Sequence, residues 1–314
     1  MSELNYGGQA VMEGVMMRGS TVMAVAVRAP DGSIVIHSEP LNKAIYGSWI
    51  AKVPFVRGMT MLWDTMVLGI RTLMFSAEIA VQEQGIATPS SDSTGSVLST
   101  PLAWGSVAFS LSIAVGLFFV LPALLAKFVD QYLVNSLVSN LVEGLIRLSF
   151  VLGYVWAVGY LPDIRRVFAY HGAEHKAVHA YEHGQPLTVD AVRAYTTSHE
   201  RCGTSFILIV VIISVLIFSL LGRPGLLWRV ASRIVLLPVI VGIAYEWLKF
   251  GAKHSQSAWM RALLAPGLVM QRLTTREPDD QMIEVAIAAL ERVLDEDGRP
   301  ITAEAASSSA ATPS

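Results

Sequence analysis

The sequence predicts an α-helical integral membrane protein with about four transmembrane helices, an additional interfacial helix and a small N-terminal β element. Two observations support this fold class. Of the 314 residues, 53% are hydrophobic and only 15% are charged, whereas roughly a quarter of the residues in a soluble chain are charged. Two long runs, 103–126 and 205–222, contain no charged residue, and each approaches the about 20 apolar residues that cross a bilayer as a helix.

Residues 1–54 are predicted to form a cytoplasmic β element. The segments 21–29 and 33–38 are rich in β-branched and small apolar residues, and Pro30, Asp31 and Gly32 between them have the residue types of a tight turn. We therefore expect a β-hairpin. Upstream, several glycines interrupt an apolar run, which favours a bulged or looping backbone over a packed helix.

Residues 55–82 are predicted to form an interfacial or amphipathic helix. Its charged residues are Arg57, Asp64, Arg71 and Glu78, and a spacing of seven drifts by only about 20° per step, so they form one stripe. Such a helix either lies in the membrane interface or packs against a bundle with one wet edge, and we favour the first. The Ser, Thr, Gly and Pro content of 83–102 predicts a flexible linker.

The membrane region is predicted at 103–248. Its spans are 103–126, about 143–161, 205–222 and about 232–248, the last bent at Pro238. Lys and Arg counts alternate between high and low in the connecting segments, which places both termini and a His-rich loop, 162–204, in the cytoplasm. The expected location is the cell inner (plasma) membrane, crossed several times, with membrane lipid as the partner. The sequence does not predict the oligomeric state.

The C-terminal segment 249–300 is predicted to be helical and cytoplasmic. Within it, 279–294 has the period of an amphipathic helix that starts after Pro278 and stops before Gly298. The tail 301–314 is predicted to be disordered. The apolar face consists of Met282, Ala286, Ala289, Leu290 and Val293.

Composition also excludes some functions. With 23 Lys and Arg against 25 Asp and Glu, the net charge is near zero, so no overall field attracts nucleic acid. The single cysteine, Cys202, cannot form an internal disulfide. The first residues lack the basic and then apolar pattern of a cleaved signal peptide.

Five of the seven histidines lie in the 162–204 loop. In a helix, His171 and His175 would share one face at the spacing that binds one metal ion. His-x-x-Glu-His is also the inverted-zincin pattern, in which Glu174 acts as general base. His199 and Cys202 follow and offer another imidazole and a thiol, a donor set that suits zinc.

Several residues in this set have alternative interpretations. Solvated side chains on a cytoplasmic helix are the alternative interpretation of the histidines, and His179 and His183 are better explained as surface residues. Cys202 is equally well explained as a small buried filler. Glu246, an acid inside the fourth span, is a candidate third ligand or acid/base group, although an interfacial salt bridge explains it better.

Four blocks of the sequence resemble the YqhQ-like bacterial membrane proteins, a family with domain of unknown function 1385. The blocks are 7–19, 171–176 with His171, Glu174 and His175, 201–206 after His199, and 271–278. The resemblance implies the membrane architecture and a metal-dependent enzyme. It also includes Glu13 and Arg18, for which a strand-edge ion pair is the better interpretation. In that family proline commonly follows the histidine at the 199 position, where this chain has Glu200.

The predicted function is that of a metal-dependent hydrolase at the cytoplasmic membrane face. A divalent metal, zinc, would be bound by His171 and His175 with His199 or Cys202, and Glu174 would activate a water. The main alternative is a non-catalytic protein with a structural or sensory metal site, which four protein ligands usually close. A transporter is disfavoured, because the spans contain few polar residues and no clear inverted repeat.

Overall fold

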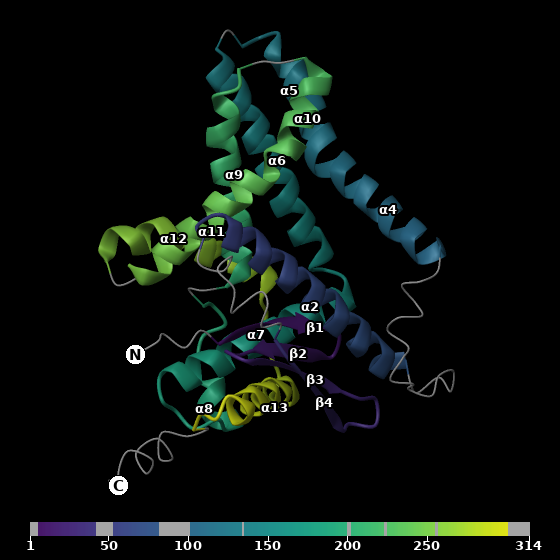
Figure 1. The fold of residues 1–314 in the computed structure, drawn as a ribbon, viewed down its shortest axis with the longest axis vertical. Helices are drawn as coiled ribbons and strands as arrows, with labels where there is room; N and C mark the ends of the chain where they lie inside the picture. Colours follow the sequence, from purple (N-terminus) through teal and green to yellow (C-terminus); the bar gives the residue numbers. More distant parts are fainter. Residues whose placement is uncertain are drawn as a thin grey trace.

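The computed structural model describes residues 6–41, 53–81, 101–133, 135–199, 202–222, 225–254 and 257–300. A tall bundle formed by α5, α6, α9 and α10 stands over a layered region that contains the sheet, α7, α8 and α13, and α4 descends away from the bundle on one side (Figure 1). Helices α2, α11 and α12 lie between the two. The predicted tail, and the predicted linker except its last two residues, lie outside the described residues.

The N-terminal element is a four-stranded antiparallel sheet in the order β1-β2-β3-β4. The predicted hairpin is β3 (Val22–Arg28) and β4 (Ile34–Pro40), joined through Gly32 at a φ of +88°. The glycine-rich opening is a second regular hairpin, β1 (Gly7–Val11) and β2 (Gly14–Arg18), and not the bulged or looping backbone that the sequence suggested. Its turn is tight because Glu13 adopts a φ of +52°.

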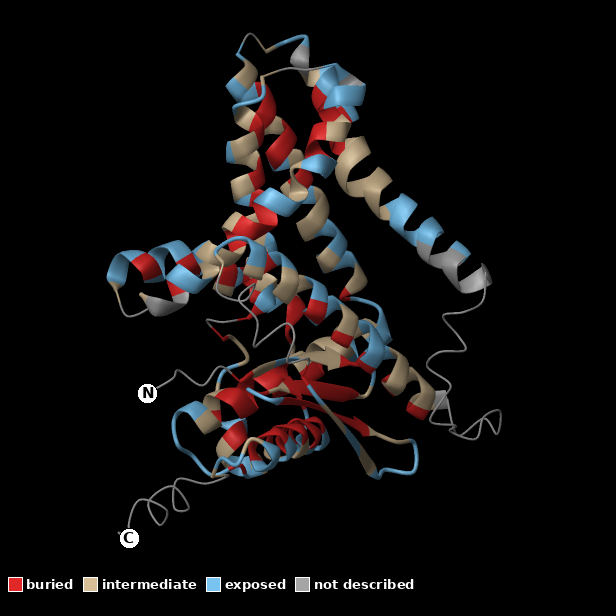
Figure 2. Cartoon of the chain, in the orientation of Figure 1, coloured by how far each residue is buried: buried red, intermediate tan, exposed pale blue. Residues whose placement is uncertain are grey.

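Both faces of this sheet are covered, which explains why its central strands are apolar at nearly every position. Helices α7 (Pro162–Glu182) and α13 (Asp280–Glu296) cover one face, with α8 (Val189–Arg193) packed against these two helices, and α2 (Val56–Val81) covers the other face. Figure 2 shows the buried residues concentrated between these layers. Alternate strand residues point to opposite faces: Val15, Met17, Val22, Ala24 and Ala26 face α7 and α13, whereas Met16, Met23, Val25 and Val27 face α2.

Helix α13 closes the core of the layered region. All five residues of its predicted apolar face are buried. The helix starts where predicted, because the Asp279 side chain accepts a hydrogen bond of 2.9 Å from the Met282 N–H, and Gly298 follows its end at a φ of +65°. The layered region is therefore assembled from three segments that are far apart in the sequence.

The upper region corrects the prediction of four spans. Only two described helices are long and apolar enough to cross a membrane, Ala108–Val129 and Ser136–Val158, and a third exists if two helices bent by 43° form one span. The third predicted span is only 17 residues long as α9, and the fourth is broken before Pro238, whose missing N–H cannot continue the helical hydrogen bonds. The elements are α4 (Pro101–Val115), the π-helix η3 (Gly116–Val120), α5 (Leu121–Asp130), α6 (Ser136–Val158), α9 (Gly203–Ser219), α10 (Leu226–Val235), α11 (Leu237–Lys253) and α12 (Ala258–Thr274).

The upper region also holds a buried ionic network, although the sequence suggested spans nearly free of polar side chains. Glu143 of α6 lies 3.0 Å from Arg147 and 3.1 Å from Arg233 of α10. Arg147 also donates to the Phe118 carbonyl in η3 at 3.1 Å. Arg229 and Arg233 of α10 point into the bundle toward α6, where both are buried.

Candidate metal centre

Three predicted ligands meet where α7 passes the start of α9. His171 and His175 stand one turn apart on α7, with ring centroids 4.4 Å apart. The Cys202 Sγ, which precedes α9, lies 3.3 Å from His171 Nε2. One donor atom from each of the three residues lies within 4.8 Å of the others. A tetrahedral zinc ion with bonds of about 2.0–2.3 Å separates its ligand atoms by about 3.3–3.8 Å, so small side-chain rotations would let the three residues bind one ion.

Backbone carbonyls orient both imidazoles. His171 Nδ1 lies 2.9 Å from the Thr274 carbonyl oxygen, and His175 Nδ1 lies 2.6 Å from that of Thr197. A carbonyl only accepts hydrogen bonds, so each Nδ1 carries the proton and donates it. In the neutral ring this arrangement leaves the lone pair on Nε2, which is the tautomer that metal-binding histidines adopt when a second partner fixes the ring.

Cys202 is the N-cap residue of α9, and its Sγ accepts a hydrogen bond of 3.4 Å from the Thr204 N–H. The first backbone N–H groups of a helix stabilise negative charge. This position therefore suits a thiolate ligand. Cys202 is also buried, so both the predicted ligand and the predicted filler are compatible with its environment.

Glu174 lies beside the three ligands and is held by the sheet. Its Oε1 accepts a hydrogen bond of 2.8 Å from the Gly8 N–H of β1, and its Oε2 lies 3.5 Å from His175 Nε2. A Cβ at Gly8 would lie 2.0 Å from the Met16 carbonyl oxygen and 3.3 Å from Glu174 Cγ. Glycine is thus required where the edge strand approaches this carboxylate.

The structure does not bring His199 into the group. Its Nε2 lies 3.2 Å from Glu182 Oε2, and its ring is closest to those of His179, at 4.5 Å between centroids, and His175, at 5.8 Å. His179 is partly buried, and this burial lowers the pKa of its imidazole. His183 is exposed, as predicted.

Glu246 lies away from the histidines, in an ion pair with Arg57. Arg57 Nε donates to Glu246 Oε1 at 2.7 Å, a second guanidinium nitrogen contacts Oε2, and the Phe55 N–H donates to Oε1 at 3.2 Å. The pairing is favourable because a guanidinium matches both carboxylate oxygens. The structure therefore contains the salt bridge that the sequence offered for Glu246, and a role for this residue as a ligand or acid/base group stays a prediction.

Sequence reasoning gave no role to the residues that hold the centre together. Gln271 is fully buried, accepts from the His199 N–H at 2.8 Å and donates to the His199 carbonyl at 2.8 Å. A Cβ at Gly172 would lie 2.2 Å from the Arg276 carbonyl oxygen. Only their membership of the 171–176 and 271–278 blocks marked these residues, since neither glycine nor glutamine indicates chemistry by its type.

The two other residues of the opening block lie outside the centre. Glu13 accepts hydrogen bonds of 2.5 and 2.6 Å from Arg166 and one of 3.2 Å from the Tyr170 hydroxyl. The hydrogen bonds from Arg166 lower the pKa of Glu13, and burial raises the pKa of Tyr170. Arg18 donates to Met61 Sδ at 3.9 Å. The ion pair formed by Glu13 joins the first hairpin to α7.

A protein-family model described as "Protein of unknown function (DUF1385)" matches residues 53–296. The chain is similar to "Uncharacterized protein YqhQ" of Bacillus subtilis (strain 168), with 35% identity over 294 residues that cover 92% of each chain. No solved structure matches. Because the family model covers more than half of the chain and this relative aligns along nearly all of it, the chain belongs to the DUF1385 family, whose function is unknown.

Proposed function

We propose that this chain is a membrane protein whose His171, His175 and Cys202 bind one divalent metal ion, zinc, and that it acts as a hydrolase. The observation that supports this proposal most strongly is the convergence of three donor atoms within 4.8 Å, with both imidazoles oriented by backbone carbonyls. Imidazole with thiolate is a donor set that zinc accepts.

The chemistry follows from the neighbouring carboxylate. When bound, a divalent metal supplies Lewis acidity to polarise the bond that is cleaved. Glu174 is the general base, which would accept a proton from the attacking water and return it to the leaving group. It is positioned for this role because the Gly8 N–H holds its Oε1 and its Oε2 lies on the side of His175 Nε2. Three protein ligands leave a coordination position open, which is typical of catalytic zinc sites.

The position of the three ligands supports action at a membrane surface. Cys202 directly precedes the apolar helix α9, and α7 follows α6, a candidate span, after only a short turn. We propose that the centre faces the cytoplasm at the plasma membrane, with both termini on the same side.

A structural metal site is the second candidate, and one distance favours it. Glu174 Oε2 lies 3.5 Å from His175 Nε2, so this carboxylate is near enough to become a fourth ligand and close the site.

Metal analysis of the purified full chain tests the centre. We expect about one zinc ion per chain in the wild type, loss of zinc in the variant His171→Ala/His175→Ala, and full retention in His183→Ala, whose imidazole is exposed near the end of α7. Equal zinc in all three proteins would refute the centre.

The variant Glu174→Gln then separates the two candidates. A hydrolase keeps its zinc but loses cleavage of a panel of ester and peptide substrates, by about 10²–10⁴-fold if Glu174 is the general base. If the site is structural, Glu174→Gln binds zinc more weakly and unfolds at a lower temperature than the wild type.

A further inference from the structure

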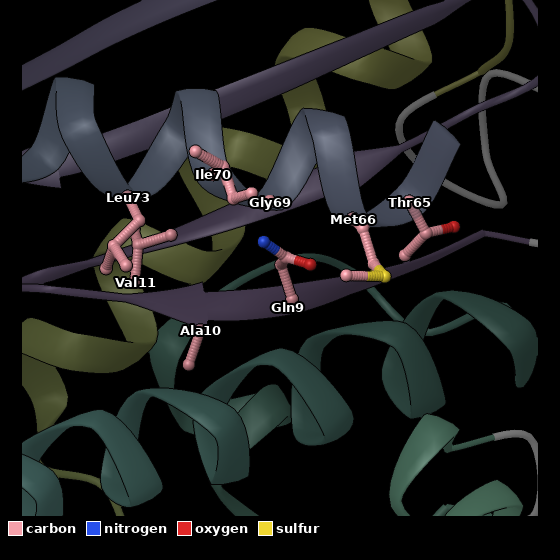
Figure 3. Close-up of a pocket in the computed structure, with 8 residues that line it drawn as sticks. All are labelled: Gln9, Ala10, Val11, Thr65, Met66, Gly69, Ile70 and Leu73. Atoms are coloured by element: carbon pink, nitrogen blue, oxygen red, sulfur yellow. The ribbon is translucent and has the colours of Figure 1, made fainter. Parts of the chain in front are cut away.

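An apolar groove of about 330 Å³ runs between the edge strand β1 and α2 (Figure 3). In the close-up, Gln9 points from β1 toward α2, and Met66 of α2 lies near it. β1 has a strand neighbour on one side only. The groove therefore follows the open edge of the sheet, and its lining is mostly apolar, with Val11, Met66, Ile70 and Leu73 as the large side chains.

The groove continues into an exposed apolar stripe on α2. The opposite side of α2 packs on the sheet through Leu68, Thr72 and Ile79, which are 8% exposed or less. The stripe residues recur every three or four positions, so they share one face of the helix. They are Val56, Met59, Trp63, Met66, Ile70 and Leu73, and each is at least 44% exposed. An exposed apolar surface of this extent marks a binding surface.

The start of this stripe is fixed to the helices of the membrane region. Arg57 pairs with Glu246 of α11, which belongs to the bent pair that is apolar enough to form a span. A Cβ at Gly58 would lie 2.7 Å from the Tyr245 side chain, so α2 and α11 approach closely here. The stripe therefore begins beside helices suited to a bilayer, and Trp63 is the kind of residue that favours the interface.

The groove lies on the face of β1 that borders α2. Gln9 lines it and donates to Thr72 of α2, whereas the neighbouring Gly8 N–H donates to Glu174 on the opposite face. We propose that the α2 stripe lies on the membrane surface and that the groove holds an acyl chain of a membrane lipid. Lipid binding in the groove does not rest on the proposed hydrolase.

A second copy of the chain is a less suitable occupant. A coiled-coil seam at this spacing is stabilised by Ile, Val and Leu at every contact position, while three of the six stripe residues are Met59, Trp63 and Met66. An extended peptide would pair only one side of its backbone with β1 and would place the polar groups of its other side against a mostly apolar lining. Both remain outcomes of the test below.

The test uses the full chain reconstituted in vesicles that contain a phospholipid with a photoreactive diazirine in its acyl chain. After irradiation, mass spectrometry maps the labelled residues. We expect labels on 9–11 and 65–73, and about a tenfold loss of these labels in Ile70→Asn, because a polar side chain removes apolar contact from the groove. Leu73→Asn provides a second variant at the other end of the lining. The control Met59→Asn changes the stripe outside the groove and should keep the groove labels.

Three results would overturn the proposal: labels confined to the helices of the upper region, equal labelling of wild type and both groove variants, or cross-links at these residues to a second copy or to a peptide. The variant His171→Ala/His175→Ala separates the two proposals. If it loses zinc and keeps the groove labels, the metal centre and the lipid groove are both supported and are independent of each other. If the wild type contains no zinc but is labelled in the groove, only the hydrolase fails.

Discussion

Replacing Gly172 by alanine tests whether the 271–278 segment positions the candidate metal centre. Alanine is favoured over glycine inside a helix by about 1 kcal/mol. Here, however, the added Cβ would lie 2.2 Å from the Arg276 carbonyl oxygen and 3.2 Å from Thr197 Cγ2. Both neighbours must move, and overpacking of this kind costs typically about 1–3 kcal/mol. Because the clash involves backbone, we expect the cost to exceed the helical gain.

The movement also affects the histidines. Arg276 follows Thr274 by two residues, and the carbonyls of Thr274 and Thr197 hold His171 and His175. Loss of such outer contacts lowers metal affinity by about 10–100-fold. We therefore expect Gly172→Ala to unfold at a lower temperature in detergent and to lose zinc to a competing chelator at a lower chelator concentration.

The control is Gly153→Ala in α6, where a Cβ would meet nothing within 4 Å. It should be neutral or slightly stabilising and should leave zinc affinity unchanged. If Gly172→Ala matches this control in both measurements, the close approach of the 271–278 segment does not position the centre.

Three further predictions concern groups outside the ligands. Glu143→Gln leaves buried arginines without their carboxylate, and we expect a loss of about 3–5 kcal/mol in unfolding measurements; an unchanged midpoint would show that the network is not a stability element. Gln271→Leu removes the side-chain hydrogen bonds that Gln271 makes with the His199 N–H and carbonyl, and loss of a buried hydrogen-bond partner costs about 1–3 kcal/mol; hydrogen exchange of the His199 amide should accelerate. The lowered pKa of Glu13 means that its ion pair with Arg166 stabilises the fold above a pH of about 4.5 and that this contribution is lost as the pH falls below it. The unfolding midpoint of Glu13→Gln should therefore fall less steeply than that of the wild type during acid titration, and parallel curves would contradict this.

The elements that periodicity or turn chemistry specifies locally could be predicted from the sequence. The β3–β4 hairpin and the buried face of α13 follow from alternation, a glycine turn and a 3.6-residue period. The predicted number of spans was wrong. Hydropathy detects an apolar run, but it does not detect that α9 ends at Ser219 or that the helix breaks before Pro238. Packing between segments far apart in the sequence could not be predicted either, so the sequence could not show that α13 and the sheet cover α7.

The arrangement of the candidate ligands could be predicted in part, while metal binding itself stays a prediction. The spacing of His171 and His175 specifies a shared helix face, and of the two further ligands that the sequence offered, the structure places Cys202 beside them. The interactions of Glu246 and His199 depend on which segments meet in space: Glu246 faces Arg57, and Gln271 holds His199. Neither contact leaves a periodic pattern in the sequence.

The discontinuous construction of the layered region sets an order for its folding. Strands from 7–40, helix α7 and helix α13 share one hydrophobic core, so the first hairpins expose an apolar face until residues 280–296 have been synthesised. Nonlocal contacts of this kind form slowly and leave partly folded chains prone to aggregation. By then the apolar helices of the upper region have already left the ribosome, so α13 joins a chain that is already partly assembled. Removal of α13 would therefore expose the face of the sheet that borders α7. It would also free the preceding 271–278 segment, which contacts the candidate metal centre through the Thr274 carbonyl.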